Sequence, residues 1–160
     1  MACDIHAMIE EFVIPPCSSE KSGYWRCSGE VLIMRDYELF AILGNVRNEQ
    51  DIVSIGENRL LAHLDEKGRF NDSISEISDL FRYWFNRRVC DNHSPSFVTL
   101  GELDHYFVAH QYDETVSKET WTTIKEIVSR MKILSHIPHP EYDASPRNPS
   151  QIRLTFFFDN

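Results

Sequence analysis

The 160-residue chain has little of what marks several large classes of protein. Its four cysteines show no CxxC spacing and are too few for a disulfide scaffold, which favours free thiols in a reducing compartment. No stretch approaches the roughly 18 uninterrupted apolar residues of a membrane helix, and the N-terminus lacks the basic start and apolar core of a signal peptide. We therefore expect a cytoplasmic protein that does not enter a membrane.

Basic residues are also scarce, because 16 Lys and Arg stand against 25 Asp and Glu, for a formal net charge of -9. This charge repels the backbone of duplex nucleic acid, so we expect no duplex partner, while a small anionic ligand can still bind in a local basic pocket. The chain has no P-loop, no GxGxxG after a strand, no nucleophile elbow and no zinc-finger spacing. The phosphate- and dinucleotide-binding folds that these motifs mark are excluded.

What the chain does have is enough apolar residues, 42% of the total, to form one core, and we expect a single domain over residues 1–160. Alternating patterns predict strands over residues 3–14 and 151–158, and a strand or hairpin over 24–34. Residues 48–71 predict a small insertion around a short helix. Residues 135–150, with four prolines, predict a long surface loop.

Capping signals predict the helices. Asp36 can cap a buried helix over residues 37–46. The segments 73–76 (SISE) and 99–102 (TLGE) are capping boxes, and each predicts a helix; Ser117 starts a further one. The sequence thus predicts an α+β fold, in which a small, mostly antiparallel sheet that includes the N- and C-terminal strands packs against four or so helices.

The opening residues, MACDIH, combine three reactive side chains with a strand pattern. Alternation along the strand sends Cys3 into the core, where a buried structural thiol is expected, and displays Asp4 and His6 together on the opposite face. If the last strand pairs antiparallel with the first, Asp159 lies beside Asp4, Phe157 beside His6 and Arg153 beside Glu10. A slip of one residue would turn these side chains to opposite faces.

Such a group could act in two ways. His6 and Asp4, with His93 from the polar loop 91–96, are the predicted catalytic residues, since histidine can serve as acid or base near neutral pH. Alternatively, Asp4, His6 and Asp159 are the predicted ligands of a divalent metal, which needs three or four donors. A polar strand face that merely meets water, and a loop that merely turns and caps, explain the same residues.

Other residues are candidates for holding a substrate. Arg47 and Arg153 can neutralise phosphate, Tyr37 can stack on a base, and Ser94 can bind an anion beside the next helix. Further arginines near residue 85 could form an anion clamp or simply a solvated basic helix end. They are Arg82, Arg87 and Arg88.

Several blocks of the chain, in order, resemble an uncharacterised family of bacteriophages and some bacteria whose members begin Met-Gly-Cys-Asp-Ile-His, with alanine here in place of glycine. The blocks are residues 1–6 (MACDIH), 35–43 with 46–47 (RDYELFAIL and VR), 93–96 (HSPS), 99–103 (TLGEL) and 153–160 (RLTFFFDN). The resemblance implies a phage-type accessory protein of the host cytoplasm. Small proteins of this kind often counter host defences by binding or destroying nucleotide signals.

Three functions follow as expectations. The first is a small hydrolase that acts on a phosphodiester or other nucleotide, metal-assisted or by acid and base catalysis. The second is a nucleotide-binding sponge without chemistry, which uses arginines and stacking aromatics such as Tyr37, Trp84 or Phe157. The third is an acidic inhibitor that binds another protein. By analogy with small phage binding proteins, we expect a homodimer.

Overall fold

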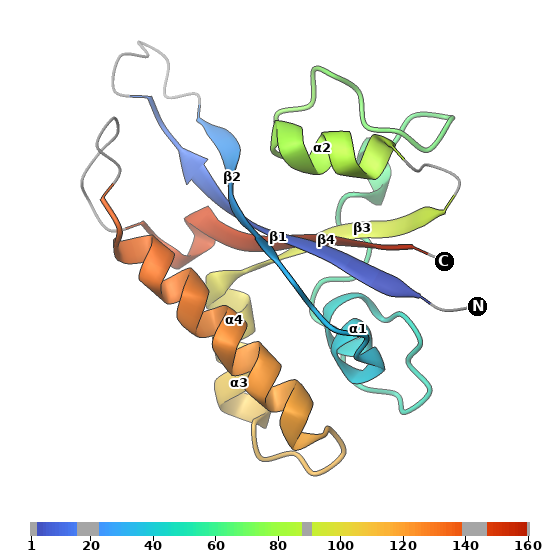
Figure 1. Cartoon of the computed structure of the whole chain (residues 1–160), viewed down its shortest axis with the longest axis vertical. Helices are drawn as coiled ribbons and strands as arrows, with labels where there is room; N and C mark the ends of the chain where they lie inside the picture. Colours follow the sequence, from blue (N-terminus) through green and yellow to red (C-terminus); the bar gives the residue numbers. More distant parts are fainter. Residues whose placement is uncertain (1–2, 16–22, 88–90, 139–146, 160) are drawn as a thin grey trace.

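The computed structural model describes residues 3–15, 23–87, 91–138 and 147–159. Its centre is a four-stranded antiparallel sheet of order β2-β1-β4-β3 (Figure 1), made of β1 (Asp4–Val13), β2 (Tyr24–Val31), β3 (Asn92–Thr99) and β4 (Ile152–Asp159). The α-helices are α1 (Tyr37–Gly44), α2 (Asp79–Asn86), α3 (Leu100–His110) and α4 (Lys118–His136), with 3-10 turns at Leu61–His63 and Pro149–Gln151. The predicted α+β fold is confirmed.

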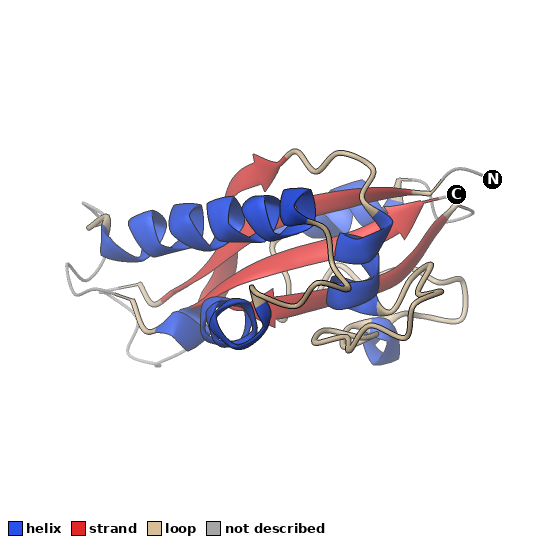
Figure 2. Ribbon diagram, turned by 90° about the horizontal axis from the view of Figure 1, so that it is seen from below, coloured by secondary structure: helices blue, strands red, loops and turns tan. Residues whose placement is uncertain are grey.

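Both faces of the sheet are covered. Helices α1, α3 and α4 lie on one side of the strands and α2 on the other (Figure 1), and the long α4 runs alongside the sheet (Figure 2). The larger core, on the first side, includes Ile5, Phe40 and Phe156. The smaller core, on the second side, includes Met8, Phe81 and Phe157. In the described ranges, no helix is both long and apolar enough to cross a membrane.

The pairing of β1 with β4 confirms the predicted register. Asp4 is opposite Asp159, His6 opposite Phe157 and Glu10 opposite Arg153. Because side chains alternate along both strands, the polar residues of the two strands share one face while Ile5 and Phe158 share the other.

A carboxylate at the centre of the sheet is completely buried. Glu10, with no exposed surface, accepts hydrogen bonds from Arg153 Nε at 2.9 Å, Thr155 Oγ1 at 2.7 Å and the backbone N–H of Ser78 at 2.9 Å. A second guanidinium nitrogen, Arg153 Nη2, lies 2.7 Å from the same carboxylate. The network ties both terminal strands to Ser78, the residue just before α2.

The arginine of this pair lies between two aromatic rings. Its guanidinium carbon is 3.6 Å from the ring centre of Trp25 on β2 and 4.6 Å from that of Phe97 on β3, and Nη2 also donates to the carbonyl of Glu76. Burial lowers the pKa of Arg153, and the Glu10 carboxylate acts against that shift. All four strands therefore contribute to the surroundings of one buried ion pair.

Two predicted boundaries are wrong. The second strand ends at Val31, and the side chains of Leu32 and Met34, 93% and 86% exposed, lie beyond it. The box at residues 73–76 starts no helix: α2 begins at Asp79, and Ser78 is its N-cap. The Ser78 amide is bound by Glu10, so a contact with the sheet fixes where this helix begins.

The loop predicted at residues 91–96 is also wrong, because residues 92–96 belong to β3. Proline and serine suggest a turn, but the strand accommodates them with a bulge between His93 and Ser96. Ser94 has φ 51°, a left-handed conformation that lets the extra residue fit. Elsewhere the box at Thr99 and the cap at Ser117 start α3 and α4 as predicted.

The remaining predictions concern loops. Residues 48–71 form an irregular segment whose only 3-10 turn is Leu61–His63 among the residues described, and Leu60 and Phe70 anchor it in the smaller core. Helix α4 continues to His136, further than the predicted loop allows. Half of that loop, residues 139–146, lies outside the described residues.

The Glu10–Arg153 pair predicts an asymmetric response to substitution. Arg153→Met leaves a buried carboxylate without its charged partner and should lower the free energy of unfolding by about 3–5 kcal/mol. The double variant Glu10→Gln/Arg153→Met keeps an acceptor for Ser78 and removes both charges, so it should lose clearly less. Urea denaturation measures both. Equal losses in the two variants would contradict the assignment of the cost to the unpaired charge.

A second prediction concerns pH. Glu38 on α1 accepts from the backbone N–H of Ser117 at 2.8 Å and from Thr120 Oγ1 at 3.0 Å, joining α1 to the start of α4. Burial raises the pKa of this carboxyl, but the hydrogen bonds from Ser117 and Thr120 together outweigh burial and lower it below its ordinary value.

Because the folded pKa is lower than the unfolded one, the contribution of Glu38 is fully present above the ordinary glutamate pKa of about 4.3 and is lost as pH falls through the folded pKa. Glu38→Gln should therefore lower the free energy of unfolding by about 1 kcal/mol at pH 7 and by less at pH 3, measured by urea denaturation. The exposed Glu57→Gln is the matched control and should change little at either pH. A loss of equal size at both pH values would refute the linkage.

Candidate active site

The end of the sheet where β1 begins and β4 ends holds a histidine–aspartate pair. His6 Nε2 lies 3.0 Å from Asp159 Oδ2, and the side chains are 35% and 16% exposed. A carboxylate only accepts hydrogen bonds, so in the neutral imidazole this contact places the proton on Nε2 and the lone pair on Nδ1. Within the described ranges, no group hydrogen-bonds Nδ1 of His6.

The ring of His6 is held by an aromatic neighbour. It stacks on Phe157 with ring centres 4.9 Å apart and planes at 22°. Phe157 is in turn held by edge contacts with Phe81 and Phe85 of α2, at 5.6 Å and 5.3 Å. The smaller core therefore fixes the plane against which the histidine lies.

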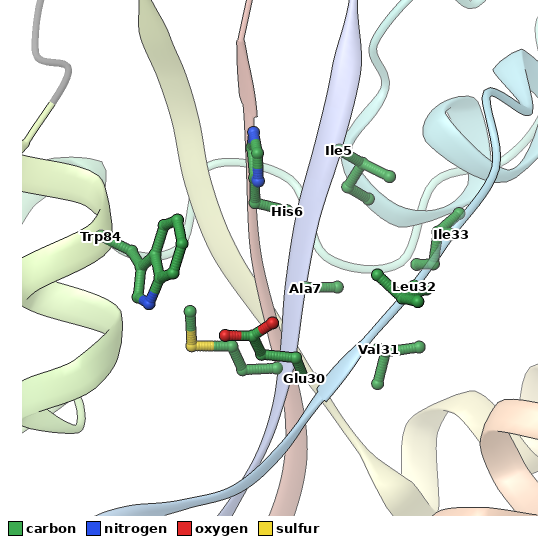
Figure 3. Close-up of a pocket in the computed structure, with 9 residues that line it drawn as sticks. Ile5, His6, Ala7, Glu30, Val31, Leu32, Ile33 and Trp84 are labelled. Carbon is green, nitrogen blue, oxygen red and sulfur yellow. The ribbon is translucent and has the colours of Figure 1, made fainter.

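The histidine is accessible because the sheet is narrower at this end. The last pair between β1 and β2 joins Ala7 and Val31, so His6 extends past the end of β2. Beside it is a hollow of about 210 Å³, whose lining includes Glu30 of β2, Leu32 just after the end of β2, and Trp84 of α2 (Figure 3).

A second, smaller hollow of about 80 Å³ adjoins the first, since His6 and Trp84 line both. Its other lining residues are Phe157, Arg87 at the C-cap of α2, and Asn92 at the start of β3. The site thus combines a histidine, two aromatic rings, a guanidinium and an amide. Helix α2 and strands β1, β3 and β4 supply them.

Asp4 borders this site but is engaged elsewhere. Its carboxylate binds Arg35 Nη2 at 2.8 Å and Nε at 3.0 Å, while its backbone N–H donates to Asp159 Oδ1 at 3.3 Å. The pKa of Arg35 is raised, and the hydrogen bond with Asp4 is the largest cause. The backbone of Asp4 therefore helps to position Asp159, while the carboxylate of Asp4 is paired with Arg35.

The structure does not bring His93 to this group. In the register with β4, His93 is opposite Phe158, and its ring stacks on Phe158 at 5.9 Å, on the other face of the sheet from His6. Its Nδ1 lies 3.0 Å from the hydroxyl of Ser94, the other predicted site residue of this segment. The neighbouring Asn92, opposite Asp159, takes the position on the His6 face that the sequence predicts for His93.

Tyr37 and Arg47 meet in a separate hollow of about 330 Å³ beside α1, which shares no lining residue with those at His6. Arg47 has φ 55°, a left-handed conformation uncommon for a residue with a side chain. These two predicted substrate-binding residues therefore lie together, but apart from the histidine.

The remaining predicted groups have structural contacts. Arg153 is buried with Glu10, where a ligand cannot reach it without disrupting the core. Arg82 binds Asp79 at 2.9 Å and the carbonyl of Asp72 at 2.9 Å. Arg87 lines the site, Arg82 does not, and Arg88, the third arginine of the predicted clamp, lies outside the described residues.

Cys3 lies in the larger core, as its place on the strand predicts. Burial raises the pKa of its thiol, and the nearby Arg47 lowers it by less. The thiol therefore stays protonated near neutral pH, which suits packing and not nucleophilic attack.

The predicted metal ligands do not converge. His6 and Asp159 are hydrogen-bonded to each other, and the carboxylate of Asp4 forms a salt bridge with Arg35. Across the described ranges, no group of three or more His, Cys, Asp or Glu side chains is arranged to hold a metal ion. The donor set among the described residues does not fit a divalent metal.

Sequence reasoning missed Asn92 as an individual residue of the site, although it lies in the polar segment that was singled out. Alternation from Asp159 across the sheet would have found it, but only with the pairing of β3 and β4 known. The bulge at Ser94 hides that pairing, because it shifts the parity of every residue before it.

Compared with protein-family models, curated proteins and solved structures, the chain matches none.

Proposed function

We propose that the protein is a small hydrolase that cleaves a phosphodiester or another nucleotide phosphoester, with His6 as its acid and base and Asp159 as the residue that positions His6. The observation that carries the proposal is the 3.0 Å contact from Nε2 to Asp159, which directs the basic Nδ1 away from the carboxylate in a ring stacked on Phe157. Acid and base catalysis needs such a histidine, held in one tautomer beside a binding hollow.

In this mechanism Nδ1 of His6 takes a proton from a water molecule as the water oxygen bonds to phosphorus. Asp159 stabilises the imidazolium that forms, since its carboxylate lies against Nε2. The phosphorus–oxygen bond to the leaving group then breaks, and the leaving oxygen takes the proton back from Nδ1. Arg87 supplies positive charge at the phosphate.

The lining of the hollows supports a nucleotide as the substrate. The indole of Trp84 and the stacked rings of His6 and Phe157 suit a planar base. Arg87 and Glu30 line different hollows, so a phosphate is favoured on the Arg87 side. The resemblance to a phage and bacterial family adds a host nucleotide signal as the biological substrate.

The aromatic lining also favours a second candidate, a sponge that binds the nucleotide and leaves it intact. Stacking on Trp84 requires no catalytic group, and Tyr37 with Arg47 forms a further hollow that combines a ring and a cation. Intact nucleotide released from the purified protein on heat denaturation would identify this function.

The hydrolase is tested by incubating the purified protein with a panel of cyclic and linear nucleotides, with a chelator or with Mg²⁺ or Mn²⁺, and separating the products by chromatography. We expect product without added metal. His6→Gln should lower the rate about 10²-fold or more, because the base is lost. Asp159→Asn should also lower it, because an amide cannot stabilise the imidazolium as a carboxylate does.

The matched control is His105→Gln, which replaces an exposed histidine of α3 and should leave the rate unchanged. His93→Gln separates this site from the composite site expected from the sequence, since His93 lies on the other face and its loss should spare activity if the fold is intact by circular dichroism. The proposed hydrolase activity would be refuted if His6→Gln formed product at the wild-type rate, or if no nucleotide gave product.

A further inference from the structure

One buried polar atom in the hollow beside His6 lacks a hydrogen-bond partner among the described residues. The side-chain oxygen of Asn92, Oδ1, is buried, and no group in the described part of the chain hydrogen-bonds it. The amide nitrogen of the same side chain donates to the carbonyl of Phe85 at 2.7 Å. That bond fixes the orientation of the amide, because turning it over would set two oxygens against each other.

A buried acceptor without a donor is unfavourable, and native structures keep few of them. Asn92 lines the smaller hollow together with Arg87, Trp84, His6 and Phe157. Oδ1 has almost no surface open to water, so a ligand that carries an N–H group into this hollow would satisfy it once the lining side chains move aside.

The hollow limits what that ligand can be. The smaller hollow has a volume of about 80 Å³ and the adjoining hollow one of about 210 Å³. Each is smaller than the roughly 300 Å³ at which pockets for drug-sized ligands begin. Hollows of this size, which His6 and Trp84 both line, suit one flat ring system, and the rest of the ligand stays outside. Arg87 at the rim attracts an anionic group attached to such a ring.

We propose that Asn92 Oδ1 accepts a hydrogen bond from the exocyclic amino group of a nucleobase, so that the site selects nucleotides whose bases carry an amino group. The inference takes its ligand class from the function proposed above and adds the group that decides which nucleotide binds. A site whose acceptor is left unpaired by the wrong ligand discriminates against it strongly.

The test uses pairs of nucleoside 5′-monophosphates that differ only by replacement of the amino group with hydrogen. They are AMP with purine riboside monophosphate, CMP with pyrimidin-2-one riboside monophosphate, and GMP with inosine monophosphate. Equilibrium dialysis against the wild-type protein gives the ratio of the two dissociation constants in each pair. We expect the amino form to bind tenfold or more tightly in at least one pair.

Two variants separate the amino contact from the rest of the site. Asn92→Ala removes the acceptor, so the ratio should fall toward one. Trp84→Leu removes the stacking ring, so both members of a pair should weaken and the ratio should persist. Because Asn92 also binds Phe85, circular dichroism checks that Asn92→Ala folds, and the ratio in wild type stands as a test even if it does not.

Binding and turnover are measured separately, so the two proposals can fail independently. An amino preference without hydrolysis of any nucleotide supports the Asn92 contact and removes the hydrolase. Hydrolysis with ratios near one in all three pairs overturns the Asn92 contact and leaves the hydrolase. Failure of every monophosphate to bind also overturns the contact, as does a preference that survives in folded Asn92→Ala.

Discussion

The buried carboxylate of Glu10 is the constraint from which the rest of the arrangement follows. With no access to water, it needs donors from the protein, and they come from Arg153, Thr155 and the Ser78 amide. These donors lie on β4 and at the start of α2, so satisfying one carboxylate holds three elements together. The arginine that neutralises it is enclosed by rings from the two outer strands.

The candidate site depends on this network in two places, the β1–β4 pair and helix α2. Pairing of Glu10 with Arg153 sets the same β1–β4 register that brings His6 to Phe157 and Asp4 to Asp159. Anchoring Ser78 sets the start of α2, from which Phe81 and Phe85 fix the ring of Phe157 and Trp84 reaches the hollow. The site is therefore the exposed margin of the smaller core, where its apolar packing gives way to polar groups.

Asp159 illustrates how this margin positions charge. It receives the backbone N–H of Asp4 on one oxygen and faces His6 with the other. Asp4 itself is bound by Arg35, so the two aspartates have different partners although they face each other across the strands. Asp159 orients the imidazole of His6, and Asp4 hydrogen-bonds Asp159 through its backbone N–H.

The alternation within residues 3–14 and 151–158 sufficed to predict the terminal strands, their shared polar face and the pairing of Asp4 with Asp159, because strand periodicity is local and apolar faces must coincide. Only the tertiary structure decided the rest. The bulge at Ser94 moves His93 to the other face and leaves Asn92 beside the histidine, and long-range burial turns Arg153 from a candidate ligand into a core ion pair. Bulges and burial depend on contacts between distant segments, so no local pattern contains them.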